Sequence, residues 1–277
     1  MPRRNVNIGG AELDTVVAGD GPVTVIFENG LATPLEIWQA VVPPVAAVAR
    51  TIRYDRRWAP LSGPLPRRSP SEIVGDLEKL LHALDARPPY VLVGHSWGGA
   101  LIRLFAHAHP SEVAGLVFVD ATHESLDPRV LALMPAMNAT LSLLCRAPVV
   151  RRALLRQLCP PSSLPAYRAR MEERLLDPAR WPIGLRTIRA ESPAIPVGLA
   201  QLRRDCPDLP PIPVHVLTAG AVSRKSARRV YDAWKEAAAR AANARYTHVA
   251  NSSHYMPVDA PGVVVDAILG VLAAVPA

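Results

Sequence analysis

A serine near the middle of the chain lies in a pattern typical of a catalytic nucleophile. Residues 90–99 read Tyr-Val-Leu-Val-Gly-His-Ser-Trp-Gly-Gly, so an apolar run leads into Gly-x-Ser-x-Gly centred on Ser96. When such a pattern forms a tight turn from a strand into a helix, the serine is strained and its hydroxyl is exposed. Gly94 and Gly98 fit this turn because a Cβ atom at either position would clash across it. The sequence therefore predicts Ser96 as the nucleophile of a nucleophile elbow.

A serine hydroxyl is a poor nucleophile until a base takes its proton. His254 lies in Asn-Ser-Ser-His-Tyr, after the last predicted strand and before the last predicted helix. Six of the other seven histidines lie in predicted strands or helices or beside Ser96, and His123, which follows a strand, is the rival. We expect His254 to be the base.

The base needs an acid that fixes its tautomer and stabilises its positive charge. The loop after the predicted strand Val214–Leu217 is the usual place, but it carries no carboxylate, and the next acid, Asp232, lies well inside a predicted helix. Asp120 ends the preceding strand, Gly115–Val119, and is the available substitute. Asp120 is the predicted third member of a catalytic triad.

An oxyanion hole requires two backbone N–H groups that face the developing negative charge. Trp97, the residue after the nucleophile, supplies one of them. Leu31, in the loop Glu-Asn-Gly-Leu that follows the strand Val23–Phe27, is our choice for the second. Three residues near these loops are candidate pocket residues: Asn29, His123 and Tyr255.

The elements that must position these residues alternate between strand and helix patterns. Short β-rich runs occur at Val23–Phe27, Thr51–Tyr54, Tyr90–Val93, Gly115–Val119, Val214–Leu217 and Tyr246–Val249. Helical patterns occur at Ile37–Val48, Gly98–His109, Ser226–Ala242 and Gly262–Ala273. A further helix is expected to begin after an N-cap at Ser71. Val6–Ala18 resembles an antiparallel hairpin at a sheet edge. This order predicts an α/β fold with a mostly parallel, twisted sheet and helices on both faces.

A long insertion interrupts the alternation after the sixth strand. Residues 124–205 show helical patterns without a convincing strand. Because open α/β sheets bind ligands at the carboxyl ends of their strands, we interpret this segment as a helical cap. The predicted domains are a core of residues 1–123 and 206–277 and a cap of residues 124–205.

Composition narrows the class of protein further. The chain has 277 residues, of which 49% are hydrophobic, so it can bury a sizeable core. Three cysteines form neither a disulfide framework nor a zinc site. The first residues lack a hydrophobic signal core and the apolar tail is too short to span a bilayer, so we expect a cytoplasmic protein without stable membrane insertion.

Taken together, these motifs resemble the α/β-hydrolase superfamily, in its esterase and prolyl-iminopeptidase-like branch. The resemblance rests on Phe27–Leu31 with Trp38, Tyr54–Arg56, Gly94–Gly99, Val117–His123 and Ser253–Asp259. The chain departs from the pattern in having Asn29 where many members have His, Trp58 where many have Gly, and no acid after Val214–Leu217. The resemblance implies an enzyme that uses no cofactor, and the chain shows neither metal-ligand spacing nor a phosphate loop.

The charge of the chain is concentrated in the insertion. Residues 126–204 contain 13 arginines and five acids, whereas the whole chain has a net charge of +7. Either the arginines form solvated helix faces, or they form a positive rim that attracts an anionic substrate, a carrier-bound acyl group or an anionic surface. No nucleic-acid-binding module accompanies the charge, so we expect no nucleic-acid partner.

The leading hypothesis is a serine hydrolase that cleaves a small carboxylic ester through an acyl-enzyme. A peptidase, lactonase, C–C hydrolase or acyltransferase would use the same triad, and a non-catalytic binding protein is the alternative of a different class. A prolyl peptidase would need an acidic cap pocket, which the basic insertion disfavours. Epoxide hydrolases and dehalogenases need a carboxylate nucleophile, which Ser96 is not. The sequence leaves the physiological substrate and the oligomeric state open.

Overall fold

An eight-stranded sheet forms the centre of the protein. We describe a computed structural model of the chain that covers residues 3–57, 66–220 and 225–276. The strand order is β1-β2-β4-β3-β5-β6-β7-β8. The β1–β2 and β2–β4 pairs are antiparallel, and every pair from β4 to β8 is parallel. The strands are β1 (Arg3–Asn7), β2 (Glu12–Ala18), β3 (Thr24–Glu28), β4 (Arg50–Tyr54), β5 (Tyr90–His95), β6 (Val113–Val119), β7 (Val214–Ala219) and β8 (Ala244–Val249). The α/β fold and its edge hairpin are as the sequence predicts.

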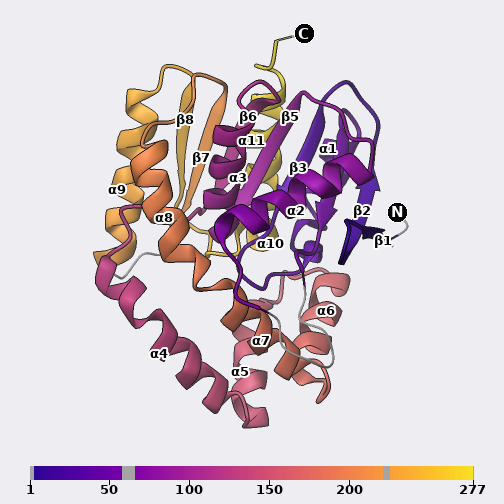
Figure 1. Cartoon of the computed structure of the whole chain (residues 1–277), viewed down its shortest axis with the longest axis vertical. Helices are drawn as coiled ribbons and strands as arrows, with labels where there is room; N and C mark the ends of the chain where they lie inside the picture. The colour runs from indigo at the N-terminus through magenta and orange to yellow at the C-terminus, as the bar shows by residue number, and fades with distance from the viewer. Residues whose placement is uncertain (1–2, 58–65, 221–224, 277) are drawn as a thin grey trace.

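Helices cover both faces of this sheet (Figure 1). One face carries α2 (Pro70–Ala83), α3 (Trp97–Ala108), α8 (Ala194–Asp205) and α9 (Lys225–Arg240), whose buried side chains share one apolar cluster. The other face carries α1 (Val42–Ala46) and α11 (Pro261–Leu272). Two short helices, η1 (Leu35–Trp38) and α10 (Met256–Asp259), lie close to each other and near the ends of the strands.

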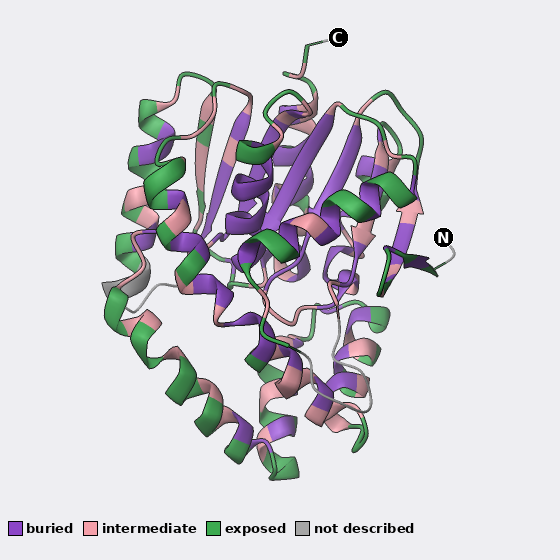
Figure 2. Cartoon of the chain, in the orientation of Figure 1, coloured by how far each residue is buried: buried purple, intermediate pink, exposed green. Residues whose placement is uncertain are grey.

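The central strands divide their side chains between the two apolar clusters. In β5, Leu92 belongs to the cluster under α2 and α3, whereas Val91 and Val93 belong to the cluster under α1 and α11. All three are completely buried, because side chains alternate between the faces of a strand and both faces are covered. Figure 2 shows this buried centre. Strand β5 ends at His95, and Ser96 follows it as the N-cap of α3.

Two predicted helix features are wrong in detail. The single helix expected over Ile37–Val48 is divided into η1 and α1, because Pro43 and Pro44 can only be accommodated at the start of a new helix. The N-cap of α2 is Ser69 and not Ser71: Ser69 accepts a hydrogen bond from the Glu72 N–H, and the Glu72 carboxylate accepts one from the Ser69 N–H. This reciprocal capping box, with proline in the first turn, outcompetes a cap two residues later.

Five helices follow one another between β6 and β7, the place of the predicted cap. They are α4 (Pro128–Leu144), α5 (Pro148–Leu158), α6 (Pro165–Leu176), α7 (Trp181–Glu191) and α8. Figure 1 shows α4 to α7 beyond one end of the sheet, while α8 packs on α2 and α3. We refer to α4 to α7 as the inserted helices.

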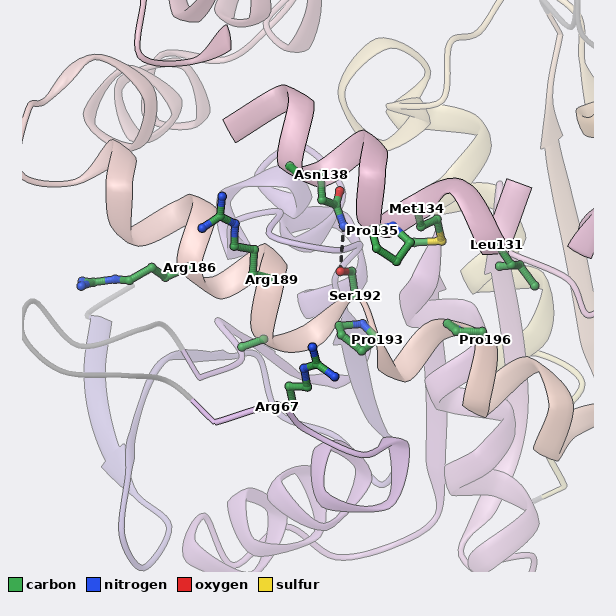
Figure 3. A pocket seen from close by; sticks show the side chains of 12 residues that line it. Arg67, Leu131, Met134, Pro135, Asn138, Arg186, Arg189, Ser192, Pro193 and Pro196 are labelled. Carbon is green, nitrogen blue, oxygen red and sulfur yellow. Dashed lines mark hydrogen bonds between the residues drawn. The ribbon is translucent and has the colours of Figure 1, made fainter. Parts of the chain in front are cut away.

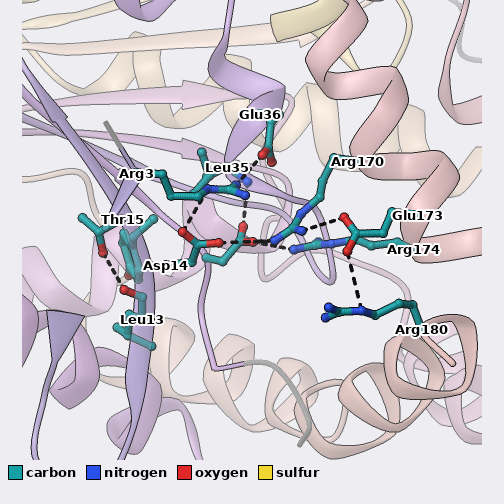
Figure 4. Close-up of polar contacts among 12 residues, drawn as sticks. Arg3, Leu13, Asp14, Thr15, Leu35, Glu36, Arg170, Glu173, Arg174 and Arg180 are labelled. Atoms are coloured by element: carbon teal, nitrogen blue, oxygen red, sulfur yellow. Dashed lines mark hydrogen bonds and ion pairs between the residues drawn. The ribbon is translucent and has the colours of Figure 1, made fainter. Parts of the chain in front are cut away.

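The inserted helices meet the rest of the protein through a cluster of charged side chains (Figure 4). Arg174 of α6 donates to an oxygen of Asp55, just after β4, at 2.5 Å, and to the backbone oxygen of Ala32 at 3.2 Å. Arg170 lies 3.3 Å from Asp14 and 3.6 Å from Asp55. The arginines of α6 therefore pair with carboxylates of the sheet, an arrangement that neither interpretation of the basic insertion anticipates.

Helix α4 differs from the other helices in its exposure. Ser142 is its only buried residue, and Leu133, Met137, Leu143 and Leu144 are each at least half exposed. Figure 2 shows α4 as largely exposed along its length. Among the described helices, none alone has the length and apolarity to cross a membrane; α4 and α5 meet that test only as a pair bent by 118°.

Candidate active site

The turn that carries Ser96 is strained and closely packed. Ser96 has φ 54° and ψ −122°, a conformation that side-chain-bearing residues rarely adopt. Its N–H donates to the Val119 oxygen of the neighbouring strand, and its own carbonyl accepts from the Thr122 N–H. A Cβ atom on Gly94 would lie 2.7 Å from the Gly98 oxygen, and one on Gly98 would lie 2.4 Å from the Glu28 oxygen. The turn therefore requires glycine at both positions.

Three predicted site residues form a continuous hydrogen-bonded chain. His254 Nε2 lies 3.0 Å from Ser96 Oγ, and His254 Nδ1 lies 2.5 Å from Asp120 Oδ2. The three residues come from different parts of the sheet: Ser96 follows β5, Asp120 follows β6, and His254 lies between β8 and α10. The His254 side chain is 46% exposed, whereas that of Asp120 is 6% exposed.

Asp120 is held from several sides. Its Oδ1 accepts from the Ala219 N–H at 3.0 Å, and the Tyr231 hydroxyl of α9 supplies a further hydrogen bond. Burial alone would raise the pKa of Asp120, but the His254 contact and these hydrogen bonds hold that pKa below its usual range. Asp120, like Ser96, has a positive φ, of 43°. Tyr231 was not predicted, because one tyrosine inside a helix carries no sequence signal for a partner about a hundred residues away.

His95 contacts His254 from the side opposite Asp120. Its Nε2 lies 2.7 Å from the backbone oxygen of His254, and the two rings lie 4.8 Å apart. Since a carbonyl only accepts, Nε2 carries the proton and donates it. Burial lowers the pKa of His95 to about 3, so the ring is neutral at ordinary pH. His95 packs beside the nucleophile, as the sequence predicts, and also fixes the loop of His254.

The loop after β3 lies directly against Ser96. A Cβ atom on Gly30 would come within 3.2 Å of the Ser96 Cβ. Leu31 follows Gly30, and Trp97 is the first residue of α3, whose leading N–H groups have no partner within the helix. The structure thus brings both predicted oxyanion donors to the neighbourhood of Ser96.

The three candidate pocket residues lie in three different environments. Asn29 is buried beneath the loop, where its amide donates to the Tyr54 oxygen and accepts from the Trp38 ring N–H, both at 2.7 Å. His123 packs on a tryptophan of α9 and interacts with Ser125 through Nδ1, and burial lowers its pKa to about 4. Of the three, only Tyr255 is among the residues that line the cavity described below.

Comparison with known proteins identifies the fold family. The family model of the alpha/beta hydrolase fold matches residues 23–154, which include the nucleophile turn and Asp120. Together with the strand order and the flanking helices, this match shows that the chain has the α/β-hydrolase fold. The chain is 33% identical over 103 positions to an uncharacterized Bacillus subtilis protein, YqjL, a match that covers 37% of our chain and 41% of that relative. The chain thus matches less than half of that relative's length.

Solved structures resemble the chain over nearly its whole length. A putative epoxide hydrolase from Pseudomonas aeruginosa superimposes with a TM-score of 0.76 at 20% identity, covering 98% of our chain and 95% of the other. A thermophilic esterase from Thermogutta terrifontis superimposes with a TM-score of 0.72 at 19% identity, covering 99% and 98%. At such identities the likeness establishes the shared fold and leaves the substrate open.

An apolar cavity of about 250 Å³ lies between the loop after β3 and the inserted helices. Leu31, in the loop after β3, and Tyr255, the residue after His254, form part of its wall. Its other lining residues are mainly apolar: Ala32, Thr33, Leu141, Cys145, Leu154, Leu158, Tyr167, Met171, Arg174, Leu175, Trp181, Gly184, Leu185 and Ile188. Arg174 brings a charge to this wall, but that charge is paired with Asp55.

A larger cavity of about 630 Å³ lies between α4 and the helices α7 and α8 (Figure 3). Its apolar wall includes Leu131 and Met134, and Arg67, Arg186 and Arg189 stand around it. None of the catalytic candidates is among its lining residues. Within the described parts of the chain, no group of three or more His, Cys, Asp or Glu side chains is placed to hold a metal ion.

Proposed function

We propose that this α/β hydrolase cleaves carboxylic esters through an acyl-enzyme, with Ser96 as nucleophile, His254 as general base and Asp120 as the acid. The single observation that carries the proposal is the chain of contacts from Ser96 Oγ to His254 Nε2, at 3.0 Å, and from His254 Nδ1 to Asp120, at 2.5 Å. These are hydrogen-bond distances, and the order of groups matches a serine nucleophile, its base and the group that orients the base.

The first step is attack on the ester carbonyl. His254 accepts the Ser96 proton at Nε2 while its Nδ1–H donates to Asp120, and the serine oxygen bonds to the carbonyl carbon. Asp120, whose pKa is below its usual range, stays ionised and stabilises the imidazolium. The backbone N–H groups of Leu31 and Trp97 would bind the negative oxygen, and removal of one such donor typically costs 10²–10³ in kcat.

The second step releases the alcohol and then the acid. The imidazolium returns its proton to the alcohol oxygen as the tetrahedral intermediate collapses, which leaves an acyl group on Ser96. A water molecule then loses a proton to His254 and attacks the acyl carbonyl, and the collapse of that intermediate frees the carboxylic acid and Ser96. The half-exposed ring of His254 is accessible to water for this step.

The apolar cavity favours an ester with an apolar acyl group. It lies between Leu31 and Tyr255, beside the proposed oxyanion hole and base, and most of its lining is aliphatic or aromatic. Burial of apolar surface there would contribute about 25 cal/mol per Å² to binding. The fold is shared with a putative epoxide hydrolase as well as with an esterase. Epoxide hydrolases use a carboxylate nucleophile, and the serine at position 96 favours the ester.

The test is covalent labelling combined with hydrolysis. A fluorophosphonate should add once to the native protein, with the adduct mapped to Ser96, and it should fail to add to Ser96→Ala. A series of p-nitrophenyl esters of increasing acyl length should be hydrolysed with an acyl-enzyme visible by intact mass. Adduct formation on another residue at equal speed, or no turnover of any ester, would overturn the proposal.

A further inference from the structure

Beneath the oxyanion loop lies a buried arginine for which the mechanism above has no role. Arg56 follows β4, and its side chain is 7% exposed. Its guanidinium donates to the backbone oxygen of Asn29 at 2.6 Å and to that of Gly30 at 2.9 Å. These are the two carbonyls that directly precede Leu31.

Two carboxylates hold the guanidinium in place. Glu28 lies 2.5 Å from Nη1, and Glu191, in the last turn of α7, lies 2.6 Å from Nη2 and 3.1 Å from Nε. Burial works against the charge of Arg56, but these carboxylates more than compensate and raise the pKa of Arg56 above its usual value. The arginine is therefore charged and fixed when it contacts the loop.

The geometry of a peptide group links this contact to the oxyanion hole. In a trans peptide the C=O and N–H point in opposite directions, so a Gly30 carbonyl turned toward Arg56 turns the Leu31 N–H away from it. The Gly30 position packs against Ser96. A cation on the carbonyl also polarises the peptide, and hydrogen bonds in such chains strengthen one another.

We propose that Arg56 is a positioning residue that aims and polarises the Leu31 N–H of the oxyanion hole, and that Glu191 of the inserted helices keeps Arg56 in place. This inference rests on the proposed function, because it assigns Arg56 a part in the same reaction. Residues far from the reacting atoms then control the transition state, and α7 must be docked for the hole to be complete.

The variants are Arg56→Lys and Glu191→Gln, with Arg57→Lys as the matched control. Lysine keeps the charge but cannot reach both carbonyls and both carboxylates as the guanidinium fork does. Glu191→Gln keeps the shape of the side chain but removes its negative charge, which weakens its contact with the Arg56 guanidinium. Arg57 is the neighbouring arginine and pairs with Asp76 at 2.6 Å instead of the loop. Circular dichroism and denaturant midpoints verify folding of each variant. If Arg56→Lys is unstable, Glu191→Gln tests the same contact from its other side.

The decisive readout compares an ester with its thionoester, in which sulfur replaces the carbonyl oxygen. Sulfur accepts hydrogen bonds poorly, so an intact hole favours the oxygen ester. We expect Arg56→Lys to lower kcat about 10–100-fold, which is at or below the lower end of the loss of about 10²–10³ when one oxyanion donor is removed, with KM changed less than about threefold. The preference for the oxygen ester should shrink in parallel, and Glu191→Gln should show a smaller change in the same direction.

A second readout does not depend on turnover. In Glu191→Gln, the Leu31 amide proton should shift upfield and exchange faster with solvent, while Arg57→Lys leaves it unchanged. Unchanged oxygen-to-sulfur preference and an unchanged Leu31 amide would overturn the role of Arg56, with the ester hydrolase standing. Absence of a Ser96 adduct in the native protein would instead overturn the proposed function, and the Leu31 amide would still decide whether Arg56 acts on the loop.

Discussion

The sheet and the inserted helices are stabilised in different ways. In the sheet, Val91, Leu92 and Val93 are completely buried between two layers of helices. In the inserted helices, α4 buries a single residue. Helix α6 joins the apolar cluster under α1 and α11 through Tyr167 and Met171, and its Arg170 and Arg174 add charge pairs with carboxylates beside the sheet. Apolar burial is non-directional, whereas paired charges define particular contacts. The difference indicates a rigid centre that holds the catalytic chain and a more open layer attached to it at defined points.

The largest expected effect is on the catalytic chain of the core. Asp120→Asn should lower kcat by up to about 10⁴-fold, because the amide favours the wrong His254 tautomer, while KM changes little. The check is steady-state ester hydrolysis. Asp232→Asn, on the exposed side of α9, is the control and should keep native kcat. Near-native turnover in Asp120→Asn, with loss in Asp232→Asn or Glu124→Gln, would show that the acid lies elsewhere.

The next effect is on the attachment of the inserted helices. Arg174→Met leaves the buried Asp55 carboxylate with the Leu35 N–H and the more distant Arg170, so the free energy of unfolding should fall by about 3 kcal/mol. Urea denaturation measures this, with the exposed Arg156→Met as a control that should change stability by less than about 0.5 kcal/mol. If the two variants are equally stable, apolar contacts alone attach α6 to the sheet.

The histidine contribution to acid sensitivity should come from the core alone, since all eight histidines lie outside residues 124–205. Burial lowers the pKa of His95 to about 3 and of His123 to about 4, so below pH 6.5 the unfolded chain binds protons that the folded one does not. Their stabilisation is complete above pH 6.5 and is lost as pH falls toward these values, by up to about 1.4 kcal/mol per pH unit for each histidine.

The measurement is urea denaturation between about pH 4.5 and pH 7. His123→Phe should reduce the slope of stability against pH by one histidine's share, and His82→Gln, on the exposed face of α2, should leave it unchanged. An unchanged slope in His123→Phe would mean that this ring is protonated in the folded protein.

The smallest effect concerns the net charge of the insertion. An ester whose acyl chain ends in a carboxylate should gain no more than about threefold in kcat/KM over its neutral isostere. Arg174 in the cavity wall is neutralised by Asp55, and exposed charges are screened beyond about 8 Å at physiological salt. A larger advantage that disappears at about 1 M salt would favour the positive rim instead.

Local patterns made the core and its catalytic chain predictable. The β-rich runs and the Gly-x-Ser-x-Gly turn depend on neighbours in sequence. Asp120 was predicted because the loop after β7 contains no Asp or Glu. Residues 221–224 of that loop lie outside the described part of the chain. Trp58, a departure from the family pattern, also lies outside the described residues. The contact of Arg56 with Glu191 and that of Arg174 with Asp55 each join residues more than a hundred positions apart, so no local spacing indicates them.

The strained backbone at Ser96 sets stability and activity against each other at one position. A non-glycine residue in such a conformation typically costs about 1–3 kcal/mol. Ser96→Gly would release that cost and should melt a few degrees above Ser96→Ala, although the proposed mechanism requires both to be inactive. An engineer who selects this protein for heat resistance alone would therefore enrich variants that have lost the proposed nucleophile, and any such selection needs a simultaneous requirement for turnover.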